Sequence, residues 1–89
     1  MSTSTTVRCS GIPYRQGILE VRHDIHPGFV NLECWMLDPA IDINRLEPAA
    51  AELPDSAVIA NSELELSLAQ ARELVRLLQA AIRMVERTS

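Results

Sequence analysis

Aromatic residues, cysteines and long apolar runs are scarce in this sequence. One Trp, one Tyr and one Phe are its only aromatic residues, so Leu, Ile, Val and Ala must build most of the core. Cys9 and Cys34 are too few for a disulfide framework, although a single bridge between them stays open. No apolar run approaches the roughly 18 residues of a transmembrane helix, and residues 1–6 lack the pattern of a signal peptide. We therefore expect a cytoplasmic protein with reduced thiols and no membrane partner.

Lysine is absent, because all eight basic residues are arginine, and twelve acidic residues outnumber them. The net charge of −4 and the isoelectric point near 5.0 argue against direct nucleic-acid binding, which depends on clustered positive charge. A length of 89 residues suits one core rather than two. We expect a flexible Ser/Thr-rich tail over residues 1–6 and a single domain over residues 7–89.

Patterns of period two predict antiparallel β-strands before and after a tight turn. Residues 18–25 and 29–37 flank the turn sequence HPGF at residues 26–29. It fits a type II turn, because proline fixes φ at the second position and glycine supplies a positive φ at the third. Residues 6–9 are a candidate edge strand, and residues 57–66 are a candidate bent strand.

A long helix is predicted from Ser67 to about Arg87. Ser67 and Gln70 have the spacing of a capping box, in which each side chain bonds to the backbone amide of the other residue. No Gly or Pro interrupts the segment, and apolar residues recur at steps of three and four, forming one wide stripe. The stripe comprises Leu68, Ala71, Leu74, Val75, Leu78, Ala81, Ile82 and Val85.

These elements predict an α+β fold in which a small antiparallel sheet of three or four strands packs on one long C-terminal amphipathic helix. The helix is expected to cover the sheet face of Val30 and Leu32. Phe29, Trp35 and Leu37 would then lie on the uncovered face and act as partner-binding residues. We expect a homodimer or another protein to cover them, and the alternative is that segment 38–56 folds over this face.

A band of arginines lies opposite the apolar stripe of the predicted helix. Arg72, Arg76, Arg83 and Arg87 fall within about 80° at 100° per residue. A solvated face is the plain interpretation, and a ridge that binds an anion or a protein is the alternative. Acidic residues between positions 38 and 65 offer a complementary surface on a second copy or a partner.

His23 and His26, together with Cys9 and Cys34, include the residue types that bind zinc. Their spacing is unfavourable, because there is no CxxC pair and the two histidines would face opposite sides of a regular strand. A histidine beside Asp24 could also serve as a general base, but the sequence has no nucleophile elbow or phosphate loop. We expect surface histidines, no metal and no cofactor, and keep a metal-binding or catalytic role of the His23/His26 region as an alternative.

The sequence favours a non-enzymatic protein-interaction or regulatory module of bacterial or phage type that acts by surface binding. A second interpretation is a small acidic inhibitor from a phage or mobile element, such as an anti-CRISPR protein, that blocks a basic nucleic-acid-binding surface of a host defence enzyme. The acidic stretch between residues 38 and 65 is the feature that supports it.

Overall fold

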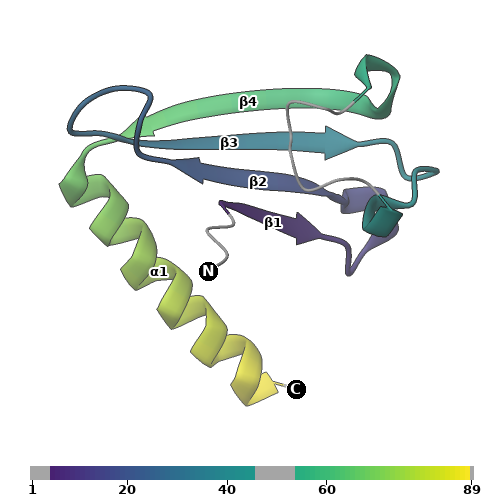
Figure 1. Cartoon of the computed structure of the whole chain (residues 1–89). Coiled ribbons are helices and arrows are strands. Elements are labelled where there is room, and N and C mark those ends of the chain that lie inside the picture. Colours follow the sequence, from purple (N-terminus) through teal and green to yellow (C-terminus); the bar gives the residue numbers. More distant parts are fainter. Residues whose placement is uncertain (1–4, 46–53, 89) are drawn as a thin grey trace.

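The computed structural model describes residues 5–45 and 54–88 of the chain. It has one four-stranded antiparallel sheet and a C-terminal helix (Figure 1), which confirms the predicted α+β class. The strands pair in chain order, β1-β2-β3-β4. Residues 1–4 of the predicted tail lie outside the described residues, and Thr6 begins the first strand as expected. The elements are β1 (Thr6–Cys9), β2 (Gly17–Arg22), β3 (Val30–Leu37), β4 (Val58–Leu66) and α1 (Leu68–Thr88).

The turn between β2 and β3 has the predicted geometry. The Phe29 N–H donates to the His26 carbonyl over 3.1 Å, and Gly28 has a φ of 83°, a conformation that glycine adopts without steric cost. β2 ends at Arg22, three residues earlier than expected, so His23 lies in the connection. β4 is a single strand as predicted, with a register irregularity where it pairs with the end of β3, between Met36 and Leu37.

The register divides the sheet into two faces of opposite character. One face, here called the polar face, carries Glu20, Glu33 and Glu63 at paired positions on three adjacent strands. The other is called the apolar face, because its positions on the four strands hold no charged residue. Its members are Val7, Cys9, Gly17, Leu19, Val21, Val30, Leu32, Cys34, Met36, Ala60, Ser62, Leu64 and Leu66.

The core lies at one end of the polar face. Ile18 and Leu37, each 1% exposed, pack with buried Ile43, and half-buried Trp35 and Val58 close the cluster. Ile43 comes from η2 (Ile43–Arg45), one of the short 3-10 turns around β3 and β4. Among the described residues, η4 (Asp55–Ala57) precedes β4, and η1 (Pro13–Arg15) lies between β1 and β2.

The prediction that Phe29, Trp35 and Leu37 together form one exposed patch is wrong. Trp35 and Leu37 do lie on the face opposite Val30, but the chain's own residues around Ile43 cover them. Phe29 precedes β3 and is 45% exposed. The alternative prediction, that segment 38–56 folds over this face, therefore holds for the described part of the segment. Residues 46–53 lie outside the described residues.

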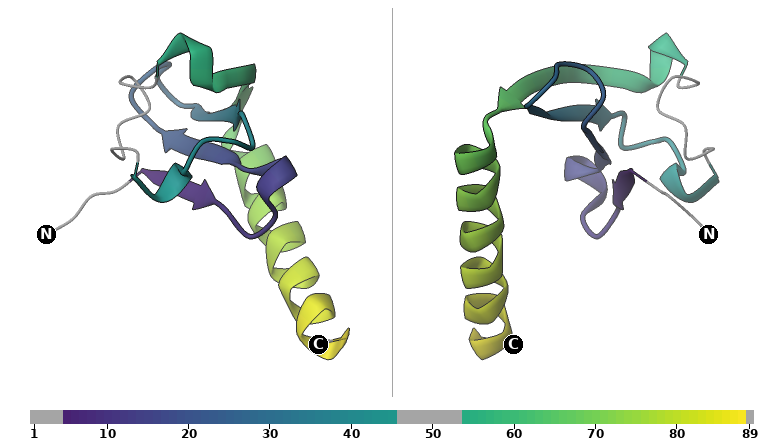
Figure 2. Two further views of the ribbon diagram at one scale, coloured as in Figure 1. Left: turned by 90° about the vertical axis from the view of Figure 1, so that its right-hand side faces the viewer. Right: turned by 60° about the vertical axis from the view of Figure 1, so that its left-hand side comes forward.

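Helix α1 begins as predicted but does not lie across the sheet. The Ser67 N–H donates to Gln70 Oε1 over 2.9 Å, and the Gln70 N–H donates to Ser67 Oγ over 3.2 Å. The helix then extends away from the sheet (Figure 2), and β4 is the strand that it mainly contacts. The predicted packing on the face of Val30 is therefore corrected. Since Ser67 alone separates β4 from α1 and is fixed in the capping box, the chain has no loop with which to fold the helix back.

Candidate interaction surfaces

The apolar face of the sheet is open to solvent over much of its area. Leu64 is 67% exposed, and Val7, Val21 and Met36 are also exposed. They come from all four strands, because every second residue of each strand faces this side in the observed register. Contiguous apolar surface of this kind marks a contact site more often than ordinary protein surface.

The second open surface is the apolar side of α1. At 100° per residue, apolar residues from Met84 through Leu78 to Leu68 span about 200° of the helix circumference. Gln70 and Thr88 are polar residues inside the span, and Glu86 lies at its edge, at the same angle as Leu68. This surface is here called the apolar arc, and its large exposed members are each 50–65% exposed. They are Leu68, Val75, Leu77, Leu78, Ile82, Met84 and Val85. Ala71 and Leu74 in the same arc are half-buried.

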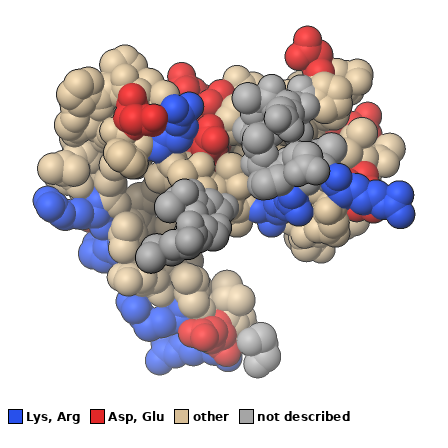
Figure 3. All heavy atoms as spheres, in the orientation of Figure 1, with Lys and Arg blue, Asp and Glu red and all other residues tan. Residues whose placement is uncertain are grey.

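The arginine band lies on the other side of α1. In Figure 3 basic side chains line the helix, while other basic side chains and most of the acidic ones lie over the sheet and its connections. Arg76 makes an ion pair with Glu73 one turn earlier. Its Nε and Nη2 donate hydrogen bonds to the two carboxylate oxygens of Glu73. Arg72, Arg83 and Arg87 are exposed. The band is thus a charged, solvated surface, and its role in binding stays a prediction.

A row of carboxylates crosses the polar face. Glu20 is paired with Glu33, and Glu33 with Glu63, so three like charges stand side by side on adjacent strands. Such an arrangement weakens strand pairing. Asn61 partly offsets it by donating from Nδ2 to Glu33 Oε2 over 3.0 Å. Glu20 and Glu33 lie outside the acidic stretch between residues 38 and 65, so only the strand register reveals that they form a row with Glu63.

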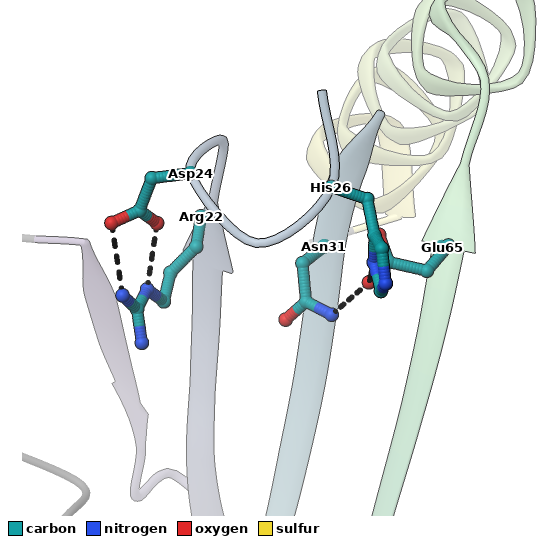
Figure 4. Close-up of polar contacts among 5 residues, drawn as sticks. All are labelled: Arg22, Asp24, His26, Asn31 and Glu65. Carbon is teal, nitrogen blue, oxygen red and sulfur yellow. Dashed lines mark hydrogen bonds and ion pairs between the residues drawn. The ribbon is translucent and has the colours of Figure 1, made fainter. Parts of the chain in front are cut away.

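Polar contacts next to the β2–β3 turn hold the other end of the sheet (Figure 4). Asn31, which is buried, donates from Nδ2 to Glu65 Oε1 over 2.8 Å, and His26 Nδ1 lies 2.8 Å from the same oxygen. These two hydrogen bonds, that of Asn31 first, lower the pKa of Glu65 below its usual value. Arg22 forms a two-pronged contact with Asp24, at 3.0 and 2.9 Å, which lowers the pKa of Asp24.

The histidines do not come together with the cysteines. His23 is exposed, and His26 contacts Glu65, while Cys9 and Cys34 are free thiols on the apolar face. Among residues 5–45 and 54–88, no three His, Cys, Asp or Glu side chains are grouped so that they could hold a metal ion. The contact of His26 with Glu65 links residues 39 positions apart, so no local sequence motif predicts it.

A shallow hollow lies beside this contact, lined by His26, Pro27, Phe29 and Glu65. A second one opens on the apolar face around Gly17, between Cys9 and Met36. Within the described stretches, no helix is both long and apolar enough to cross a bilayer. No protein family, curated protein or solved structure that was compared matches the chain.

Proposed function

We propose that this chain is a non-enzymatic protein-interaction module that acts by surface binding. The observation that carries this proposal is the apolar arc of α1, whose seven large exposed members are each at least half exposed. Burial of an aliphatic side chain of this size contributes roughly 1.5–3 kcal/mol. The exposed arc therefore leaves a large favourable free energy that only a binding partner would realise.

The charge pattern supports the same proposal. The arginine band keeps the outer side of α1 hydrated, so the helix presents one side to a partner and the other to water. Large side chains surrounded by polar ones are the usual composition of a protein interface. A cytoplasmic location and a bacterial or phage origin belong to this proposal.

The experiment compares three proteins. Leu78→Asp places a charge in the middle of the apolar arc, whereas Arg83→Gln removes one from the opposite side. Self-association by sedimentation and capture of proteins from a lysate of the native host are measured for both variants and for the wild type. We expect Leu78→Asp to weaken binding at least tenfold and Arg83→Gln to leave it unchanged. If the wild type neither self-associates nor retains any host protein, the proposal is wrong.

The acidic row on the polar face favours a second candidate function. Three glutamates at paired positions cost the sheet stability, and a basic surface of a partner would relieve this repulsion. An acidic inhibitor of a nucleic-acid-binding enzyme would use this face. The double variant Glu33→Gln/Glu63→Gln should then lose its partner while gaining thermal stability. A partner that binds equally well to this variant and in high salt would contradict the second candidate.

A further inference from the structure

The chain has two open apolar surfaces, and each has the dimensions to cover the other. Helix α1, with 21 residues, is about 31 Å long at 1.5 Å per residue. Strand β4, with nine residues, is about 30 Å long at 3.3 Å per residue. Four strands place the outer two roughly 14 Å apart, slightly more than the 10 Å width of a helix. One helix therefore covers most of one sheet face.

The helix of the same chain does not occupy that face. The Ser67–Gln70 capping box and the Ala71 N–H, which donates to the Ser67 carbonyl over 2.8 Å, fix the start of the helix at Ser67. Because β4 ends at Leu66, a connecting loop could form only by unwinding this first turn. Folding it back would require these bonds to break. A helix from another molecule meets no such restriction.

We propose that two copies of the chain form a two-fold dimer in which α1 of each subunit lies across the apolar face of the partner's sheet. This inference rests on the proposed function and names its partner as a second copy. Each subunit supplies one helix and one sheet face, so a single two-fold axis satisfies both surfaces of both chains. Contacts of this isologous kind close on themselves and do not propagate into fibres.

Charge decides which sheet face the helix meets. The apolar face carries no charged residue at its strand positions, so a helix docked on it would bury no charged residue of the sheet. The polar face would force the arc against Glu20, Glu33 and Glu63, and carboxylates that lack an oppositely charged partner are costly to desolvate. In the proposed dimer the arginine band stays in water, on the outer side of each helix.

The contact area is sufficient for a stable dimer. A helix footprint of about 31 by 10 Å is roughly 300 Å². Two helix-on-sheet contacts cover four such surfaces, which gives on the order of 1,200 Å², at the lower end of the range for specific interfaces. The 200° width of the arc adds to this, because a helix that is apolar over more than half its circumference packs against more than one element.

The native thiol of Cys34 makes the geometry testable. Cys34 lies on β3, an inner strand of the apolar face, and Leu78 lies near the middle of α1. One protein carries Cys9→Ser, so that Cys34 is its sole thiol. The other carries Cys9→Ser, Cys34→Ser and Leu78→Cys, so that its sole thiol is on the helix. The two are mixed in equal amounts and treated with a short bismaleimide linker, and the products are mapped by mass spectrometry.

We expect the wild type to sediment with about twice the 9.9 kDa chain mass. In the mixed sample we expect a link between Cys34 of one subunit and the thiol introduced at position 78 of the other. Gln79→Cys in place of Leu78→Cys is the matched control, since position 79 lies on the arginine side of the helix, and its yield should be at least tenfold lower. Circular dichroism confirms that each variant keeps its sheet and helix.

Two outcomes would overturn the dimer. Links between two helix thiols, without any to Cys34, would show that helices pair with each other instead. A monomeric wild type at tens of micromolar would also exclude it. The proposed function survives the second outcome if Leu78→Asp still abolishes capture of a host protein, and it fails along with the dimer if no protein is captured.

Discussion

The side-chain amide of Gln16 donates a hydrogen bond of 2.8 Å to the backbone carbonyl of Asp38. The same nitrogen also donates to the Ile41 carbonyl over 2.9 Å, and the Gln16 residue is 5% exposed. This contact attaches the segment after β3 to the start of β2, across 22 positions of sequence. It holds Ile43 over the core of the polar face.

Replacing Gln16 by leucine should therefore destabilise the protein markedly. The substitution keeps the side chain's bulk but removes the donor to the Ile41 carbonyl and one of the two donors to the Asp38 carbonyl, which also accepts from the Ile41 N–H. Loss of a buried hydrogen-bond partner costs about 1–3 kcal/mol. Chemical denaturation measures the change in the free energy of unfolding. Gln79→Leu, on the solvated side of α1, is the control and should change it by less than about 0.5 kcal/mol. Equal effects of the two substitutions would contradict the role given to Gln16.

Gly17 allows the backbones of β2 and β3 to approach closely. A Cβ at this position would collide with the backbone carbonyl oxygen of Trp35, whereas a Cβ at Gly11 would meet no atom within 4 Å. Gly17→Ala should cost about 1–3 kcal/mol, because a strand backbone cannot move aside as a flexible side chain does. Gly11→Ala should be neutral or stabilising by up to about 1 kcal/mol. Thermal unfolding of both variants tests this difference in sign.

The contacts of Glu65 make stability depend on pH. Because hydrogen bonds from Asn31 and His26 lower the pKa of Glu65 in the folded state, its ionised form stabilises the fold above the unfolded value of 4.5. That contribution is lost as the pH falls below 4.5 and through the folded pKa. NMR titration of the Glu65 carboxyl should give a midpoint below 4.5, and Asn31→Leu should raise it. A midpoint that Asn31→Leu leaves unchanged would be inconsistent with this cause.

The capping box should determine how firmly the first turn of α1 is held. Ser67→Ala removes the acceptor of the Gln70 N–H and should cost about 1 kcal/mol, while Ser67→Gly should cost only a few tenths. Hydrogen exchange of the first-turn amides should accelerate about fivefold for Ser67→Ala, as 1 kcal/mol corresponds to that factor. Ser62→Ala, in β4, is the control. Unchanged exchange in Ser67→Ala would mean that the box does not stabilise the helix start.

Local signals in the sequence were sufficient to predict the four strands, the β2–β3 turn and the capped helix. The alternation around Leu32, the proline and glycine of the β2–β3 turn and the Ser67–Gln70 spacing each act within a few residues, so they are readable without the fold. The antiparallel sheet and the C-terminal helix followed from them. The capping bonds and the His26–Phe29 turn are present as predicted.

The covering of each face was not predictable from these signals. Alternation shows that the two faces differ, but both contain large apolar residues, Trp35 on one and Leu32 on the other. The decisive contacts join distant residues, such as Gln16 with Asp38 and Ile43 with Ile18. The amphipathic pattern of α1 indicates that its arc is buried by something, and it carries no information on whether that surface belongs to the same chain.

The strand order has a consequence for how the molecule forms. Each strand pairs with its immediate neighbour in the chain, and the β1–β2 and β2–β3 connections are short, whereas the β3–β4 connection runs from Leu37 to Val58. Nearest-neighbour pairing keeps the contact order low for a β-structure, which favours rapid folding. Assembly between chains is a bimolecular step whose rate scales with concentration. In the proposed dimer, refolding would show two kinetic phases: a fast one independent of protein concentration, as the sheet forms, and a slower concentration-dependent one, as each helix docks on the other chain.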